Sequence, residues 1–140
     1  SPVLDTCKLA KRLGIHLEIT YLLIPGLNDS LDEIKKFCTW VVEFLGVETP
    51  VFFSRFHPYY KMDDISPTPM KTLFSVFEMA KETGILYPYL GNISDEKFEN
   101  TFCPTCNSIV VKRRGYNIDI SGFMHGKCKN CGTSIPIISN

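Results

Sequence analysis

Two pairs of cysteines constrain this chain more than any other feature of its sequence. Each pair has two residues between its cysteines, and residues 107–127 separate the pairs, which are Cys103 with Cys106 and Cys128 with Cys131. A Cys-x-x-Cys turn can point both sulfur atoms at one ion, so two such turns can enclose a metal in a tetrahedron of thiolates. The spacing therefore predicts a small zinc-ribbon-like module with a four-cysteine site for Zn²⁺.

Other uses of the same four cysteines stay open at this stage. Two disulfides or a redox dithiol would need the same residues, but in an intracellular chain thiols stay reduced and metal ligation is favoured. Thiolates do not distinguish zinc from a rubredoxin-like iron or an iron–sulfur cluster, so iron is the alternative metal and electron transfer the alternative role. His125 lies three residues before Cys128. We expect it on the surface, because four cysteines already complete a closed site.

The overall composition is that of a globular chain without a strong electrostatic preference. The chain is 44% hydrophobic and 21% charged, and its 15 basic and 15 acidic side chains give a formal net charge of zero. This balance provides no general attraction to nucleic acid or to an anionic membrane. No stretch approaches the roughly 18 apolar residues of a membrane helix, and the first residues lack the apolar core of a secretory signal. We therefore expect a cytoplasmic protein that does not bind membranes.

A basic run and two single cysteines have ordinary structural explanations. Lys112, Arg113 and Arg114 could contact phosphates, but three charges in a hairpin are more often a solvated turn, so nucleic acid is not the expected partner. Cys7 and Cys38 each occur once within a helical pattern, where cysteine usually behaves as a small buried apolar residue.

Helical and strand patterns alternate through residues 1 to about 92. We expect helices over 5–13, 30–45 and Met70–Thr83, and strands over 15–24, 51–57 and 85–90. Ser30 with Glu33 three residues later predicts a capping box, and Thr68 before Pro69 predicts an N-cap. This rhythm is typical of βα units in the parallel sheet of an α/β fold.

The number of units suggests part of a larger fold. Three parallel strands leave a sheet edge unpaired and bury little core, and the chain opens on a helix with no strand before it. These features favour the later βα units of a TIM-like barrel. The pattern then changes to turn-rich sequence that carries the four cysteines. The predicted domains are therefore 1–93, the barrel part, and 94–140, the metal-binding module.

In barrel-like α/β folds, chemistry gathers at the carboxyl ends of the strands. At the end of the second predicted strand, alternation places Arg55 and His57 on one face, so that a cation and an imidazole would meet an anionic ligand together. The alternative is that both side chains satisfy loop carbonyls or a carboxylate such as Asp63 or Asp64. Spacing alone does not separate these two interpretations.

Several segments resemble one enzyme family. They are Leu-Ile-Pro-Gly-Leu-Asn-Asp at 23–29, Ser-Arg-Phe-His-Pro at 54–58 and the Cys-Pro-x-Cys pair. Together they resemble radical S-adenosylmethionine (SAM) enzymes related to pyruvate formate-lyase-activating enzyme, in particular the AmmeMemoRadiSam branch. The resemblance implies that residues 1 to about 93 are the later strands of a partial (β/α)6 barrel, and that the four-cysteine module is a C-terminal appendage.

The resemblance also implies an activity for a longer protein. Members hold a [4Fe–4S] cluster on a Cys-x3-Cys-x2-Cys loop and cleave SAM reductively, so that a 5′-deoxyadenosyl radical abstracts hydrogen from a substrate. The substrate here is unidentified, and a protein is one candidate. None of the six cysteines has that spacing, so we expect this chain to be a C-terminal portion that is inactive by itself.

Three residues follow from the resemblance as candidate SAM contacts. His57 matches a strand-end histidine that lies near the cofactor in the activating enzymes. Arg55 is its neighbour by strand alternation. Thr20 occupies the place of a basic residue on the preceding strand of those enzymes. The main alternative function is a zinc-ribbon binding or scaffold module for protein or RNA, with the α/β part as its support.

Overall fold

The computed structural model describes residues 1–59, 61 and 63–137 and divides the chain into two compact units. The first unit is Ser1–Asn92 and the second is Ile93–Asn140. The sequence pattern placed the change between residues 93 and 94.

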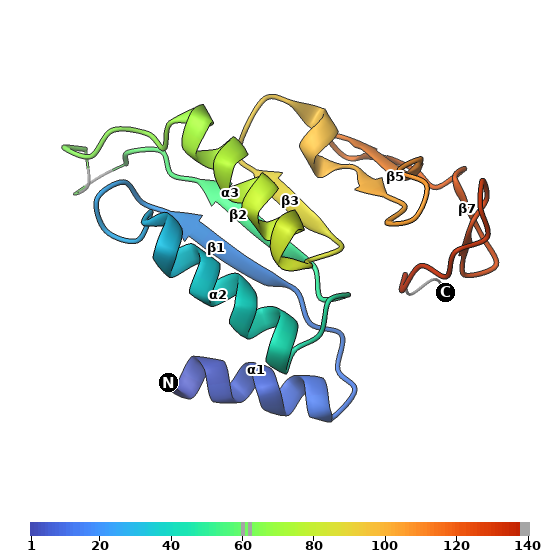
Figure 1. Ribbon diagram of the computed structural model, residues 1–140. Helices are drawn as coiled ribbons and strands as arrows, with labels where there is room; N and C mark the ends of the chain where they lie inside the picture. The colour runs from blue at the N-terminus through green and yellow to red at the C-terminus, as the bar shows by residue number, and fades with distance from the viewer. Residues whose placement is uncertain (60, 62, 138–140) are drawn as a thin grey trace. The chain divides into compact units, whose positions relative to one another are not determined.

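The first unit is a three-stranded parallel sheet in which a helix connects each strand to the next (Figure 1). Its elements are α1 (Pro2–Arg12), β1 (Ile19–Leu23), α2 (Leu31–Phe44), β2 (Val51–Arg55), α3 (Met70–Thr83) and β3 (Pro88–Gly91). The strand order is β1-β2-β3, and both neighbouring pairs are parallel. Helices α2 and α3 pack side by side on one face of the sheet (Figure 1). The mixed α/β architecture expected from the sequence is therefore present.

Aromatic side chains join α2 to this sheet. The ring of Phe37 on α2 lies 5.0 Å from that of Tyr21 and 6.4 Å from that of Phe53. The two strand residues, Tyr21 and Phe53, are themselves 6.1 Å apart. Rings at these separations bury much apolar area and add favourable edge and tilted contacts. Fully buried aliphatic residues complete this core: Leu23, Ile34, Val41, Val51, Leu73, Val76 and Leu90.

The predicted third helix, Met70–Thr83, is confirmed residue for residue, but two strands begin later than expected. Gly84 takes a left-handed φ of 113°, and the N–H of Ile85 then bonds back to the Ala80 carbonyl at 3.1 Å. This is the six-to-one bond of a Schellman motif. Ile15 bonds to the end of α1 in the same way, at 3.0 Å. Both β-prone isoleucines therefore serve helix ends rather than strands.

Both predicted side-chain caps are wrong. No side-chain hydrogen bond caps α2 at Ser30 or α3, whose N-cap is Pro69. The fully buried Thr68 has another task. Its hydroxyl donates to the Leu23 carbonyl at 2.6 Å and accepts from the Phe56 N–H at 2.8 Å. Thr68 therefore ties together the chain segments that leave β1 and β2.

The second unit consists of short antiparallel ladders after one 3₁₀ turn. Its elements are η2 (Glu96–Glu99), β4 (Thr101–Phe102), β5 (Ile109–Arg114), β6 (Asn117–Asp119), β7 (Phe123–Met124) and β8 (Lys127–Cys128). Strands β4, β5 and β6 form one sheet, and β7 pairs with β8. The β5–β6 hairpin expected from the sequence turns at Gly115, with Arg114 opposite Asn117. Among the described residues, no helix has the length and apolar character needed to cross a membrane.

Candidate metal centre

The four cysteines of the second unit gather at one point. Their sulfur atoms all lie within 4.8 Å of one another. Sulfurs of different pairs lie 3.5 Å apart for Cys103 and Cys131 and 3.7 Å apart for Cys106 and Cys128. All four thiols are free. We call these residues the four-cysteine group.

These separations have the size of a metal site. Zinc–sulfur bonds of about 2.3 Å in a tetrahedron place neighbouring sulfurs about 3.8 Å apart, whereas a disulfide joins sulfurs at about 2.05 Å. The four-cysteine group resembles the first arrangement. It could therefore hold one metal ion, as the spacing of the cysteines predicted.

The two Cys-x-x-Cys turns share one backbone design. In the first, the Cys103 N–H donates to the Ser108 carbonyl at 2.8 Å, and its carbonyl accepts from the Asn107 N–H at 2.9 Å. In the second, the same bonds join Cys128 to the carbonyl of Thr133 and to the N–H of Gly132, each at 2.8 Å. The matched turns aim two pairs of sulfurs at a common centre.

A left-handed residue follows each pair. Asn107 has a φ of 60° and Gly132 a φ of 78°, a conformation that glycine and asparagine tolerate best. Gly132 is the left-handed residue expected after the second pair, whereas Asn107, Ser108 and Thr133 were not predicted. The signal for them in the sequence is the repeat Cys-x-x-Cys-(Asn/Gly)-(Ser/Thr).

Hydrogen-bond donors near the four-cysteine group lower the pKa of two of its thiols. The Asn130 side chain, then the hydroxyl and backbone N–H of Ser108, lower the pKa of Cys106 to about 5. The Ser108 hydroxyl, then backbone groups of Cys131 and Asn130, also lower the pKa of Cys128. Both shifts favour the thiolate, which is the form that binds a metal.

The cysteines of the four-cysteine group differ in solvent exposure. Cys103 and Cys128 are 1% and 2% exposed, Cys106 is half-buried and Cys131 is exposed. By contrast, Cys38 is fully buried in α2, and burial raises its pKa to about 11. Cys38 therefore has the apolar packing role expected from the sequence.

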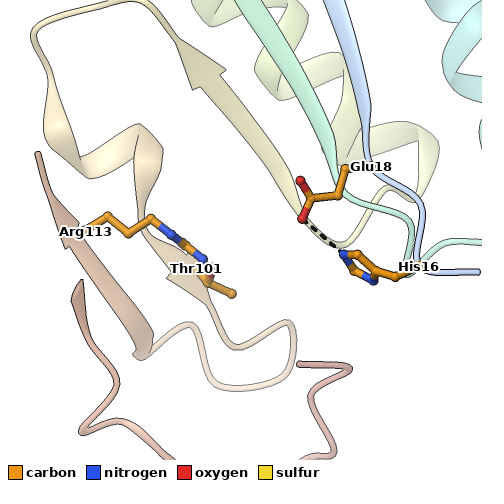
Figure 2. A network of polar contacts seen from close by, with 4 residues as sticks. All are labelled: His16, Glu18, Thr101 and Arg113. Atoms are coloured by element: carbon orange, nitrogen blue, oxygen red, sulfur yellow. Dashed lines mark hydrogen bonds and ion pairs between the residues drawn. The ribbon is translucent and has the colours of Figure 1, made fainter. Parts of the chain in front are cut away.

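None of the three histidines belongs to the four-cysteine group. His125 is exposed, as expected. His16 contacts Glu18, with 3.2 Å between Nε2 and the carboxylate, and both side chains are about half exposed (Figure 2). His57 Nε2 donates to the Asn92 carbonyl at 3.1 Å.

The predicted SAM contacts occupy different places in the first unit. Arg55 ends β2, and its Nε donates to the Thr68 carbonyl at 2.8 Å. His57 contacts a carbonyl of another loop. Both Arg55 and His57 therefore donate to loop carbonyls, which is the alternative to ligand binding that the sequence left open. Thr20 is exposed in β1 and pairs in register with Phe52 of β2, so both lie on the face of the sheet away from α2. By strand alternation Arg55 lies on the opposite face from Thr20.

The Pro-Gly-Leu-Asn-Asp loop after β1 is held by its own side chains. Asn28 donates to the Leu22 carbonyl and accepts from the Ile24 N–H, both at 2.8 Å. Asp29 accepts from the Gly26 N–H at 3.0 Å. The polar residues of this segment therefore have a structural task at the carboxyl end of β1.

The basic run is engaged within the second unit. Arg113 lies beside Thr101 (Figure 2) and donates to its hydroxyl at 2.8 Å. It also donates to the Glu99 carbonyl at 3.0 Å. Arg114 lies 3.4 Å from the Glu96 carboxylate. These contacts join β5 to β4 and η2, and Glu96 offsets the charge of Arg114.

Comparison with known proteins finds a longer archaeal relative. No family model matches the chain. Over 139 residues, which are 98% of the chain, it is 44% identical to the uncharacterized protein MJ0808 of Methanocaldococcus jannaschii. The match covers 42% of that protein, so the chain spans less than half the length of this relative.

Proposed function

We propose that the four-cysteine group binds one Zn²⁺ as a structural site of the second unit. The observation that carries the proposal is the convergence of four sulfurs within 4.8 Å on two matched turns. A closed set of four thiolates leaves no position for substrate, which is characteristic of structural zinc. In an iron–sulfur cluster the four thiolates are shared among two or more irons, and those on different irons lie farther apart, so one ion fits these separations better.

Elemental analysis with an absorbance spectrum tests this site. We expect about one zinc per chain, and no visible absorption, in protein purified without added metal. Stoichiometric iron with visible charge-transfer bands would instead favour an electron-transfer role. A chain with neither metal, and no affinity for added Zn²⁺, would refute the metal site.

We further propose that the first unit is the later part of a partial (β/α)6 barrel in a radical SAM enzyme. The proposal rests on the sequence resemblance, and the parallel order β1-β2-β3 with helices between the strands supports it. The whole protein would carry the [4Fe–4S] cluster outside these 140 residues. Cleavage of SAM and hydrogen abstraction would belong to that longer protein.

The strand ends offer suitable ligand surroundings. On the face away from α2, Phe52 stacks on Tyr89 with ring centroids 4.6 Å apart. Two residues further along β2, the same face carries Ser54 between Leu22 of β1 and Gly91 of β3. The side chains of β2 and β3 are therefore smaller at the end of the sheet where such folds bind substrates. Asn92, the partner of His57, follows directly.

Binding of SAM under anaerobic conditions tests the enzyme proposal. We expect the complete protein with its cluster to bind SAM, and His57→Ala to weaken that binding. The 140-residue chain alone should form no 5′-deoxyadenosine. Formation of this product by the isolated, reconstituted chain would contradict the proposal that cleavage of SAM requires the longer protein. Absence of SAM binding to the complete protein would contradict the proposed family.

One observation favours a binding module as the second candidate. Tyr116 and Ile118 of the β5–β6 hairpin are 105% and 64% exposed, which is unusual for apolar side chains on a small unit. Because Arg113 donates to groups of the same unit and Arg114 is paired with Glu96, a protein partner fits this hairpin better than RNA. Charge removal at Lys112, which makes none of these contacts, should then leave binding of a protein partner unchanged and should weaken binding of RNA.

A further inference from the structure

We propose that Ser108 is a positioning residue of the metal centre, where it organises three of the four ligand residues. This inference rests on the proposed binding of a metal by the four-cysteine group. The Ser108 carbonyl accepts the Cys103 N–H at 2.8 Å. Its hydroxyl lies 3.0 Å from the Cys106 sulfur and 3.4 Å from the Cys128 sulfur.

Thr133, the equivalent residue of the second turn, contacts fewer of the sulfurs. Thr133 has the same backbone role, because its carbonyl accepts the Cys128 N–H at 2.8 Å. Its hydroxyl lies 3.2 Å from Cys131, a sulfur of its own turn. Ser108 also reaches the opposite turn. The two hydroxyl residues therefore have matching backbone roles, and only the hydroxyl of Ser108 contacts a sulfur of the other turn.

The chemistry of the site gives this contact a task. Four thiolates around a divalent cation carry net negative charge, and hydrogen bonds to the sulfurs disperse it. The hydroxyl has one proton, which goes to one sulfur at a time, and the shorter distance favours Cys106. Donation at this position fixes the direction of the Cys106 side chain and holds it beside Cys128.

Substitution at Ser108 can separate the hydroxyl from the backbone. The bond between its carbonyl and Cys103 does not involve the side chain, so it is retained in any non-proline variant. Ser108→Thr and Ser108→Val have nearly the same shape and differ by a hydroxyl. The natural Thr133 in the matching turn shows that this backbone accepts a β-branched residue.

Chelator competition for Zn²⁺ is the primary test. Loss of an outer-shell partner typically weakens metal binding by about 10- to 100-fold. We expect such a loss for Ser108→Val relative to Ser108→Thr, and for Ser108→Ala relative to the unchanged chain. The control is Thr105→Ala, an exposed position of the same turn, which should bind as tightly as the unchanged chain.

Replacement of zinc by cobalt allows a second measurement, the wavelengths of the charge-transfer bands, which a general loss of stability would not change. The thiolate-to-cobalt charge-transfer bands should shift in Ser108→Ala at full occupancy, because one sulfur loses a hydrogen-bond donor, and should stay in place in Thr105→Ala. Equal zinc affinities for the threonine and valine variants, or unshifted bands in Ser108→Ala, would overturn the role of Ser108. If the valine variant does not fold, the alanine variant decides. Failure of the unchanged chain to bind zinc or cobalt would instead refute the metal site itself.

Discussion

At the scale of single residues, the chain uses small hydroxyl side chains to hold backbone segments that no regular ladder joins. Thr68 lies fully buried between the ends of β1 and β2 and satisfies a carbonyl of one and an N–H beyond the other. A buried polar group that loses its partner keeps the full cost of its lost hydration. Such residues should therefore matter more to stability than their size suggests.

We predict that Thr68→Val destabilises the first unit by about 2 kcal/mol, since it leaves the Leu23 carbonyl and the Phe56 N–H without their partner. Urea unfolding followed by fluorescence measures this, because Trp40 is the single tryptophan and lies in α2. Thr39→Val is the matched control. Its hydroxyl bonds to the Lys35 carbonyl on an exposed helix face, so it should change the unfolding free energy little. Equal effects of the two variants would contradict the assignment.

The pKa of Cys106 is lowered to about 5 by donors of the folded turns, so the reactivity of this thiol reports whether the turns are formed. Iodoacetamide attacks thiolates. If metal removal unfolds the second unit, alkylation of metal-free Cys106 should slow as the pH falls below the range of an ordinary thiol, whereas slowing only near pH 5 would show that the turns persist without metal. Cys38, which is buried with a pKa of about 11, should stay unmodified under the same conditions. Mass spectrometry of digested protein measures both sites. Added Zn²⁺ should protect Cys106, and equal labelling with and without zinc would argue against ligation.

At the scale of elements, the sequence located some elements and missed the starts of others. Apolar spacing located α3 residue for residue, and the Cys-x-x-Cys spacing located the two turns of the four-cysteine group, whereas α1 begins at Pro2 and not at the predicted residue 5. The starts of β1 and β3 were wrong because Ile15 and Ile85 bond to helix ends, a competition that β propensity does not include. The partners of Arg55 and His57 lie 13 and 35 residues along the chain, so local spacing could not identify them.

The end of α3 gives a prediction at this scale. A β-carbon at Gly84 would meet no atom closer than 3.9 Å, so a substitution there tests the backbone conformation and not packing. We expect Gly84→Ala, at a φ of 113°, to lower the unfolding free energy by about 1 kcal/mol. Gly84→Asn should cost less, since asparagine tolerates left-handed conformations better. Urea unfolding followed by Trp40 fluorescence compares them, and an alanine variant as stable as the unchanged chain would contradict the motif.

At the scale of the whole molecule, the two units depend on different interactions. The first has a core of aromatic and aliphatic side chains between its helices and sheet. In the second, the buried apolar residues outside the four-cysteine group are Val110, Val111 and Ile135, counted over the part of the chain that the structure describes. A core of this size does not stabilise a unit of about fifty residues, and such units usually need a metal or disulfides.

We therefore predict that metal removal unfolds the second unit selectively. Ligand binding to a structural zinc site is coupled to folding, so Cys128→Ser or a strong chelator should remove the order of β4 to β8. Hydrogen exchange measured by mass spectrometry should then show loss of protection in Val110 and Val111, while α2 and β2 keep theirs. Cys38→Ser, a change within the first core, should give the converse pattern. Protection of the β5 amides that survives full removal of the metal would show that the second unit folds without it, and would leave the four thiols without a structural role.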